Sequence, residues 1–84
     1  MTPQEVANEI KELMAARLGL PAEKIVPEAS LVEDLGLDSL DAVELAIAVE
    51  RRFNIDVPEE ELTKLKTVAD MVALVEARAA QAAG

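Results

Sequence analysis

The apolar positions near the start of the chain follow the period of an α-helix. They recur at spacings of 4, 3, 1 and 4 residues, at Val6, Ile10, Leu13, Met14 and Leu18. Thr2 and Glu5 form a capping-box pattern around Pro3, a residue favoured in the first turn of a helix. Gly19 is typical of the residue that follows a helix end. The pattern therefore predicts a first helix over residues 3–18.

The segment 19–38 does not continue this period. It contains two glycines and two prolines, which predicts a long loop between the first and second helices. The loop also contains apolar residues that we expect to hold it against a helical bundle: Leu20, Ile25, Val26, Leu31, Leu35 and Leu37. Ser30 and Glu33 stand at capping-box spacing, which indicates a single helical turn within the loop.

A second helix is predicted from Ser39 to Phe53, and its apolar residues fall into two stripes. The stripe that should face the core consists of Ala42, Leu45, Ala46, Val49 and Phe53. The other stripe consists of Leu40, Val43 and Ile47, and is flanked by Asp38, Asp41, Glu44 and Glu50. This second stripe either widens the core face or forms an exposed apolar strip of the kind that a partner helix binds.

Two further helices are predicted in the last third of the chain. Residues 54–58 interrupt the period, and Pro58 begins a short acidic helix whose expected buried contacts are Leu62 and Leu65. Thr67 and Asp70 form another capping box ahead of a fourth helix, whose inner face contains Val68, Met71, Val72, Val75 and Ala79. Since strand-like alternation is absent, we predict an all-α four-helix bundle with three long helices and one short helix.

Composition and charge narrow the class of protein. Eighty-four residues allow one domain, which we place over residues 1–84. The net charge is −9, and ten of the 17 acidic residues but only two of the eight basic residues lie between Glu33 and Glu61. This acidic field repels nucleic acid and anionic membranes and attracts basic protein surfaces. A solvated acidic face without a partner is the alternative interpretation of the charge alone.

The residue types that are missing exclude several functions. Without cysteine or histidine the chain cannot form disulfides or the common Cys/His metal sites, and we expect no bound metal. An acidic stretch beginning at Asp34 does not match a calcium loop, because Gly36 stands third and Leu45 twelfth. The chain has two serines but no histidine that could act as their base, and it has no tyrosine. This set of side chains argues against an enzyme.

Neither a membrane span nor a leader is expected. No stretch approaches the ~20 apolar residues that a spanning helix needs. The first five residues are polar and acidic, unlike a signal peptide. These features favour a cytoplasmic protein, and we expect it to be a monomer.

Ser39 stands out as a candidate site of modification. Asp38 can cap the second helix through its carboxylate, which leaves the Ser39 hydroxyl at the positive end of the helix dipole. Backbone N–H groups at that end favour a bound or attached phosphate. An ordinary first-turn serine is the simpler interpretation of position alone.

One segment resembles the attachment motif of acyl carrier proteins. It reads Asp34-Leu35-Gly36-Leu37-Asp38-Ser39-Leu40 and is followed by Val43-Glu44-Leu45. The resemblance extends from about Val6 to Val75. It implies a 4′-phosphopantetheine arm joined to Ser39 through a phosphodiester, with an acyl chain held as a thioester on the thiol of the arm. It also implies a phosphopantetheinyl transferase as a partner, together with acyl-transfer, condensing and reducing enzymes that have basic docking surfaces.

The resemblance further implies where partners and cargo would bind. The second helix would be the docking surface, through Leu40, Asp41, Val43, Glu44, Ile47, Glu50 and Arg51. The acyl chain would lie between the helices, against Val49, Phe53, Leu62, Leu65 and Val72. The sequence departs from fatty-acid carriers at Arg51 and Arg52, where that family is commonly acidic. Fatty-acid or related lipid synthesis is therefore the leading hypothesis, and a polyketide or other specialised pathway is the alternative.

A function of another class is a helical adaptor without a prosthetic group. Such an adaptor would bind basic helices through the Leu40, Val43 and Ile47 strip. It would leave Ser39 unmodified, so the modification state of Ser39 distinguishes it from a carrier.

Overall fold

A computed structural model describes the backbone of residues 2–83 and the side chains of residues 2–80. Its helices are α1 (Pro3–Leu18), α2 (Ser39–Phe53), α3 (Glu59–Leu62) and α4 (Val68–Ala83), with a 3-10 helix η1 (Ala22–Lys24) in the long loop. No strand occurs in this part of the chain, so the predicted all-α bundle with one short helix is confirmed. The 3-10 helix was not predicted.

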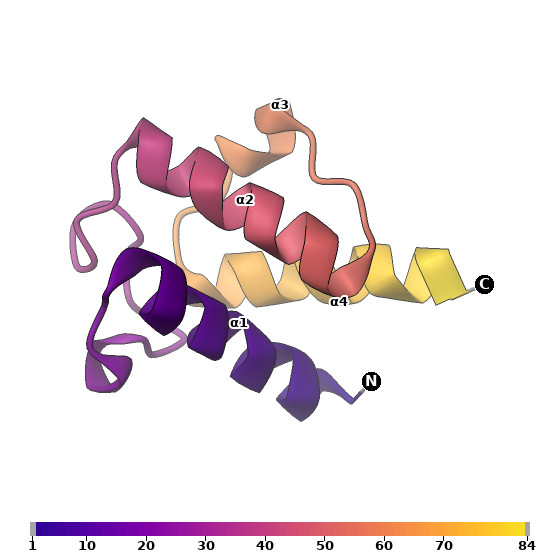
Figure 1. Cartoon of the computed structure of the whole chain (residues 1–84), viewed down its shortest axis with the longest axis horizontal. Coiled ribbons are helices and arrows are strands. Elements are labelled where there is room, and N and C mark those ends of the chain that lie inside the picture. The colour runs from indigo at the N-terminus through magenta and orange to yellow at the C-terminus, as the bar shows by residue number, and fades with distance from the viewer. Residues whose placement is uncertain (1, 84) are drawn as a thin grey trace.

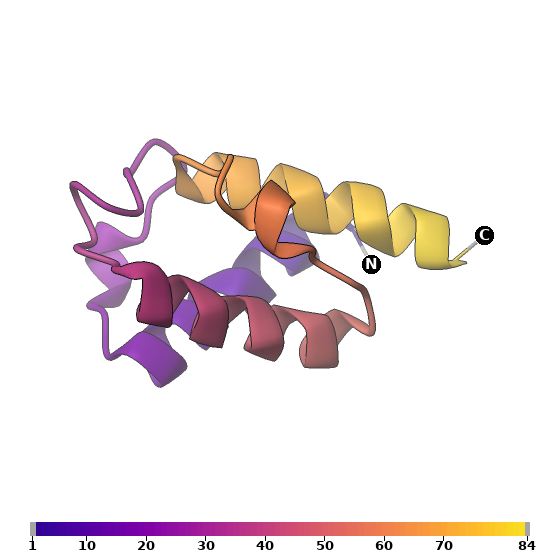
Figure 2. The ribbon, with the colours of Figure 1, turned by 90° about the horizontal axis from the view of Figure 1, so that it is seen from above.

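The long helices run along the molecule and the long loop closes one end of it (Figure 1). The start of α1 and the end of α4 lie at the other end in both ribbon views (Figures 1 and 2). α3 lies next to α2, on the side opposite α1 (Figure 1). None of the helices in the described range is long and apolar enough to cross a bilayer.

Side-chain caps define the starts of the three long helices, as the sequence predicts. Thr2 and Glu5 exchange hydrogen bonds at the start of α1, and the pKa of Glu5 is lowered chiefly by the bond from the Thr2 backbone. Asp70 accepts hydrogen bonds from the backbone N–H groups of Lys66 and Thr67, at 3.0 and 3.1 Å. These two bonds lower the pKa of the Asp70 carboxyl, since they favour its charged form. Each cap thus depends on an ionised carboxylate.

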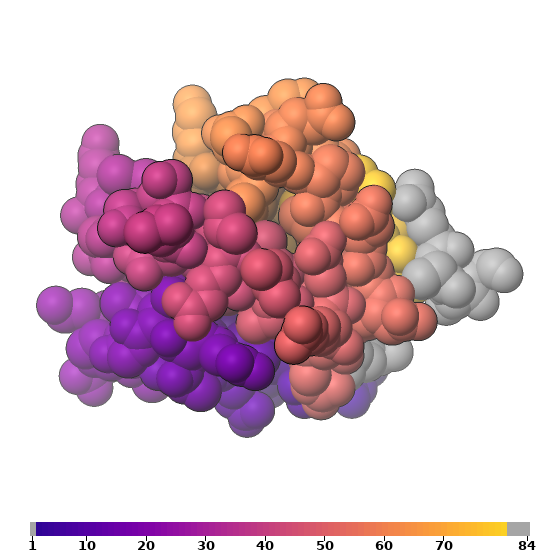
Figure 3. Space-filling view, turned by 45° about the horizontal axis from the view of Figure 1, so that its top comes forward, coloured from indigo at the N-terminus to yellow at the C-terminus, as the bar shows by residue number. Residues whose placement is uncertain are grey.

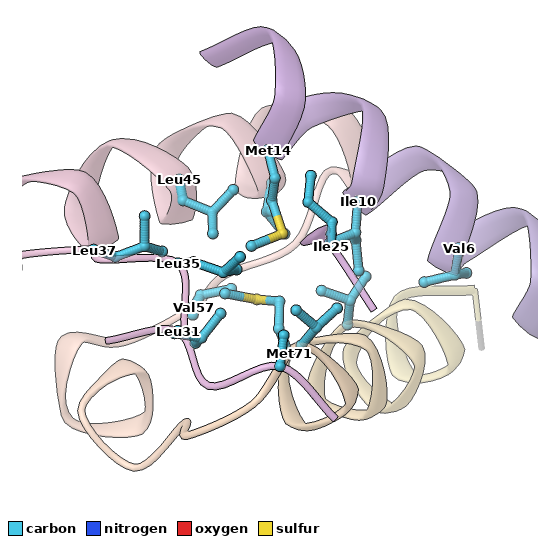
Figure 4. Close-up of a cluster of buried hydrophobic side chains, with 14 residues drawn as sticks. Val6, Ile10, Met14, Ile25, Leu31, Leu35, Leu37, Leu45, Val57 and Met71 are labelled. Atoms are coloured by element: carbon cyan, nitrogen blue, oxygen red, sulfur yellow. The ribbon is translucent and has the colours of Figure 1, made fainter. Parts of the chain in front are cut away.

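One aliphatic core joins the helices and the loop. Met14 from α1 and Met71 from α4 are fully buried and reach into its centre from opposite sides (Figure 4). The buried residues include most members of the predicted inner stripes: Val6, Ile10, Met14, Leu45, Ala46, Val49, Val68, Met71 and Val75. Leu13, Leu18 and Phe53 are partly buried against this core. The helical period therefore identified the inward faces correctly.

The long loop is an integral part of the core. Ile25, Leu31, Leu35 and Leu37 are buried, as predicted, and Leu20 and Val26 pack against them. The loop is also hydrogen-bonded to the start of α4: the N–H groups of Val68 and Ala69 donate to the carbonyls of Ala29 and Pro27. Two N–H groups that have no partner within α4 are thereby satisfied.

The predicted helical turn at Ser30 differs in detail from the observed one. The Ser30 hydroxyl accepts a hydrogen bond from the Glu33 N–H at 3.0 Å, as in a capping box. The carboxylate that accepts from the Ser30 N–H, however, belongs to Asp34, at 2.6 Å. Residues 31–35 form hydrogen-bonded turns rather than a helix, because the Leu35 N–H bonds to the Ser30 carbonyl five residues earlier. The turn ends at Gly36, whose φ of 68° favours glycine.

Candidate functional site

The start of α2 is fixed by two aspartates. The Asp38 carboxylate accepts a hydrogen bond from the Asp41 N–H at 2.9 Å, and the Asp41 carboxylate accepts one from the Asp38 N–H at 3.2 Å. The predicted cap at Asp38 is therefore present. Asp41 is predicted from the sequence to contact partners, but its carboxylate also has this local role.

Ser39 follows as the first residue of α2, and its side chain is exposed. Within the described residues, no hydrogen bond involves its hydroxyl. The chain is brought to this point by Leu37, which is buried and whose N–H donates to the Leu31 carbonyl at 2.9 Å. Ser39 thus presents a free hydroxyl at the positive end of a 15-residue helix.

An apolar hollow of about 450 Å³ opens beside Ser39, between the start of α2 and the segment that carries α3 (Figure 3). Besides Asp38 and Ser39, its lining includes Leu31, Val32, Leu37, Ala42, Val43, Leu45, Glu59, Leu62, Thr63, Leu65 and Met71. The hollow therefore joins an exposed hydroxyl to a space with mostly apolar walls.

The five residues predicted to shelter an acyl chain belong to or pack against one core, but they do not line one hollow. Leu62 and Leu65 line the hollow beside Ser39. Val49 is completely buried in the core. Phe53 lines a second hollow, near the start of α1, and Val72 lines a third one between α1 and α4. Only the two leucines after the α2–α3 connection are therefore next to Ser39.

Several lining residues were missed by sequence reasoning. Leu31, Val32 and Leu37 come from the loop, and Met71 comes from the inner face of α4. Val32 is 68% exposed, unusual for a large apolar side chain in a loop that is otherwise tied to the core. Its place directly after buried Leu31 was the available signal, since neighbours on a turn point in different directions.

The second apolar stripe of α2 is exposed rather than part of the core. The exposed fractions are 78% for Leu40, 43% for Val43 and 46% for Ile47. Of the two interpretations left open by the sequence, the structure supports the exposed strip. Together with Val32, these are the only large apolar side chains classed as exposed among the described residues.

The charged residues around this strip differ in how free they are. Glu44 and Arg51 are exposed. Glu50 is half-buried, and its carboxylate accepts a hydrogen bond from the Val57 N–H at 2.8 Å, which ties α2 to the connection before α3. Arg52 forms an ion pair with Glu9 of α1. The predicted docking residues Glu50 and Asp41 are thus engaged within the fold.

Comparison with known proteins agrees with these features. The family model of the phosphopantetheine attachment site matches residues 8–75. The chain is 47% identical to an acyl carrier protein of Thermosynechococcus vestitus over 86% of this chain and 89% of the relative. It is 42% identical to one of Akkermansia muciniphila, over 90% of this chain and 95% of the relative.

The fold agrees as well. An acyl carrier protein of Thermotoga maritima superposes with a TM-score of 0.82 over 94% of this chain and 92% of that structure, at 23% sequence identity. At this identity the likeness concerns the fold alone, whereas the family model and the closer relatives establish descent. This chain therefore belongs to the acyl carrier proteins, a family of carriers that are not themselves enzymes and that work with a covalently attached 4′-phosphopantetheine group.

Proposed function

We propose that Ser39 is the residue that carries the 4′-phosphopantetheine arm. The observation that carries this proposal is the free, exposed Ser39 hydroxyl at the first position of α2, where Asp38 supplies the helix cap instead. A capping serine would have its oxygen occupied by a backbone N–H. Ser39 is also within the stretch that matches the attachment-site family.

The surroundings of Ser39 fit a phosphodiester followed by a flexible chain. The first-turn N–H groups of α2 and its dipole favour the negative charge of a phosphate group attached to the Ser39 oxygen. The hollow beside Ser39 has room for apolar atoms, and Leu62 and Leu65 provide part of its wall. When attached, the arm supplies a thiol that holds an acyl chain as a thioester, which the cysteine-free chain cannot do by itself.

The residues of the chain then have separate tasks. Asp38 and Asp41 hold the helix start, and so fix the position of the Ser39 oxygen. Leu40, Val43 and Ile47 form the surface that partner enzymes contact. These partners are a phosphopantetheinyl transferase and acyl-transfer, condensing and reducing enzymes with basic surfaces, which the acidic charge of −9 attracts to a cytoplasmic, monomeric carrier.

Fatty-acid or related lipid synthesis is the pathway we propose. A specialised carrier, for example of polyketide synthesis, is the second candidate, and the exposed Arg51 on the docking helix favours it. Loading assays with malonyl transferases from the two kinds of synthase test these candidates: preferential loading by one transferase would identify the pathway whose enzymes fit the docking surface.

The attachment itself is tested by incubating the purified chain with coenzyme A and a phosphopantetheinyl transferase. Mass spectrometry should show one added arm on the wild type and none on Ser39→Ala. An arm on Ser39→Ala would contradict the proposal by placing the attachment at another residue. A wild type that stays unmodified with transferases of broad specificity would contradict it and favour the adaptor hypothesis.

A further inference from the structure

The exposed face of α2 carries two opposite charges in line with its apolar strip. Leu40, Glu44, Ile47 and Arg51 are spaced by four, three and four residues, which places them on one side of the helix. All four side chains are exposed. This side of α2 therefore carries a negative side chain and, two helical turns later, a positive one.

Neither charge finds a partner within its own helix. The neighbours of Arg51 one turn earlier are Ile47 and Ala48, and no base stands three or four residues from Glu44. The ion pairs present in the described structure involve Arg52 with Glu9 and Arg78 with Glu61. Glu44 and Arg51 are thus available to a binding partner.

The neighbouring charges do not mask this polarity. Arg52 is on another side of α2 and is neutralised by Glu9. Glu50 is directed towards the Val57 N–H, and Asp41 towards the Asp38 N–H. Arg51 therefore places an exposed positive side chain at the end of this face, although the half of the chain that contains it is strongly acidic.

We propose that this face binds a partner helix that carries apolar side chains opposite Leu40 and Ile47, a basic side chain opposite Glu44 and an acidic side chain opposite Arg51. The two charges are separated by about 10 Å along the helix axis, at 1.5 Å per residue. A partner with basic side chains at both positions would meet repulsion at Arg51. The inference rests on the proposed docking role of α2 and specifies the partner surface that fits this chain.

Two synthetic amphipathic helices test the proposal on the unmodified chain. Both carry the same apolar row and a lysine, and seven residues further one has glutamate and the other lysine. Either chain direction lets the Lys/Glu peptide match the two charges of α2. Titrations followed by the amide NMR signals give the dissociation constants for the wild type, Arg51→Glu and Lys11→Glu.

Lys11→Glu is the matched control. Lys11 is exposed in the middle of α1 and lines the hollow between α1 and α4, away from the strip. Its substitution changes the net charge by the same amount as Arg51→Glu. Any effect of overall charge on the two peptides is therefore the same in both variants.

We expect Arg51→Glu to shift the affinity ratio towards the Lys/Lys peptide by about three- to ten-fold relative to the wild type, since an exposed attraction becomes a repulsion. Lys11→Glu should leave the ratio unchanged. The proposal would be overturned if the affinity ratio changed equally in the two variants or did not change in Arg51→Glu. It would also be overturned if the NMR signals that respond belonged to residues outside 40–51, or if neither peptide bound. Because Ser39 is unmodified throughout, these results are independent of the arm-attachment test.

Discussion

The Nε atom of Arg52 lies 2.6 Å from a carboxylate oxygen of Glu9, and this ion pair joins the last turn of α2 to α1. Arg51, its neighbour in the sequence, is exposed and has no ion-pair partner in the described structure. Two adjacent arginines that look equivalent in the sequence therefore contribute differently. Arg52 contributes to the fold, and Arg51 is available for recognition.

This difference predicts that Arg52→Gln lowers the free energy of unfolding more than Arg51→Gln does. The expected loss for Arg52→Gln is about 0.2–1 kcal/mol, as for other partly exposed ion pairs. Urea unfolding at low ionic strength measures both variants. Glu9→Gln serves as the control, because adding it to Arg52→Gln should cost little further stability. Equal losses for the two arginine variants would refute the assignment.

The aspartate cap at Asp38 makes a second prediction. Asp38→Ala should destabilise the chain by about 0.5–2 kcal/mol, because the Asp41 N–H loses its acceptor. Asp38→Asn keeps an acceptor oxygen and should retain most of the stability. Thermal unfolding of the two variants checks this order. Since both substitutions remove the charge, equal losses would show that the charge rather than the hydrogen bond dominates.

The caps of α1 and α4 predict a pH dependence of stability. The pKa values of Glu5 and Asp70 are below their ordinary values of 4.5 and 3.8, so the unfolded chain binds protons more readily at these groups. Their contribution to stability is present above the ordinary pKa values and is lost as the pH falls through the lowered ones. Asp70→Asn should therefore lose less stability than the wild type between about pH 5 and pH 2. The prediction would be contradicted if the urea midpoints of the wild type and Asp70→Asn fell by the same amount over this pH range.

The hollow beside Ser39 predicts where an acyl chain lies. Loading the chain with an octanoyl group through the arm should shift the methyl NMR signals of Val43, Leu62 and Leu65, which line this hollow. The signals of Val72, in the hollow between α1 and α4, should stay in place. An acetyl-loaded sample provides the control for the arm alone. Signal changes confined to Val72 would instead place the acyl chain in the hollow between α1 and α4.

Local signals accounted for most of the fold. The capping boxes at Thr2 and Thr67, the cap at Asp38 and the left-handed Gly19 set the helix boundaries. These interactions join residues at most four positions apart, so the sequence contains them directly. The exposed strip on α2 followed from the same helical period.

The details that could not be predicted depend on contacts between distant segments. The sequence predicts Glu50 as a docking residue, but its half-buried carboxylate accepts a hydrogen bond from a backbone N–H seven residues away, beyond a helix end. Val72 was correctly placed on an inward-facing side of its helix, but the period does not say which hollow that side lines. The position of the long loop decided both the walls of the hollow and the exposure of Val32.

The central claim is that Ser39 alone receives the arm, and the most direct measurement is the intact mass of three proteins after treatment with coenzyme A and a phosphopantetheinyl transferase. These are the wild type, Ser39→Ala and Ser30→Ala, which removes the only other serine. We predict one added arm on the wild type and on Ser30→Ala, and none on Ser39→Ala. An arm on Ser39→Ala would contradict the account.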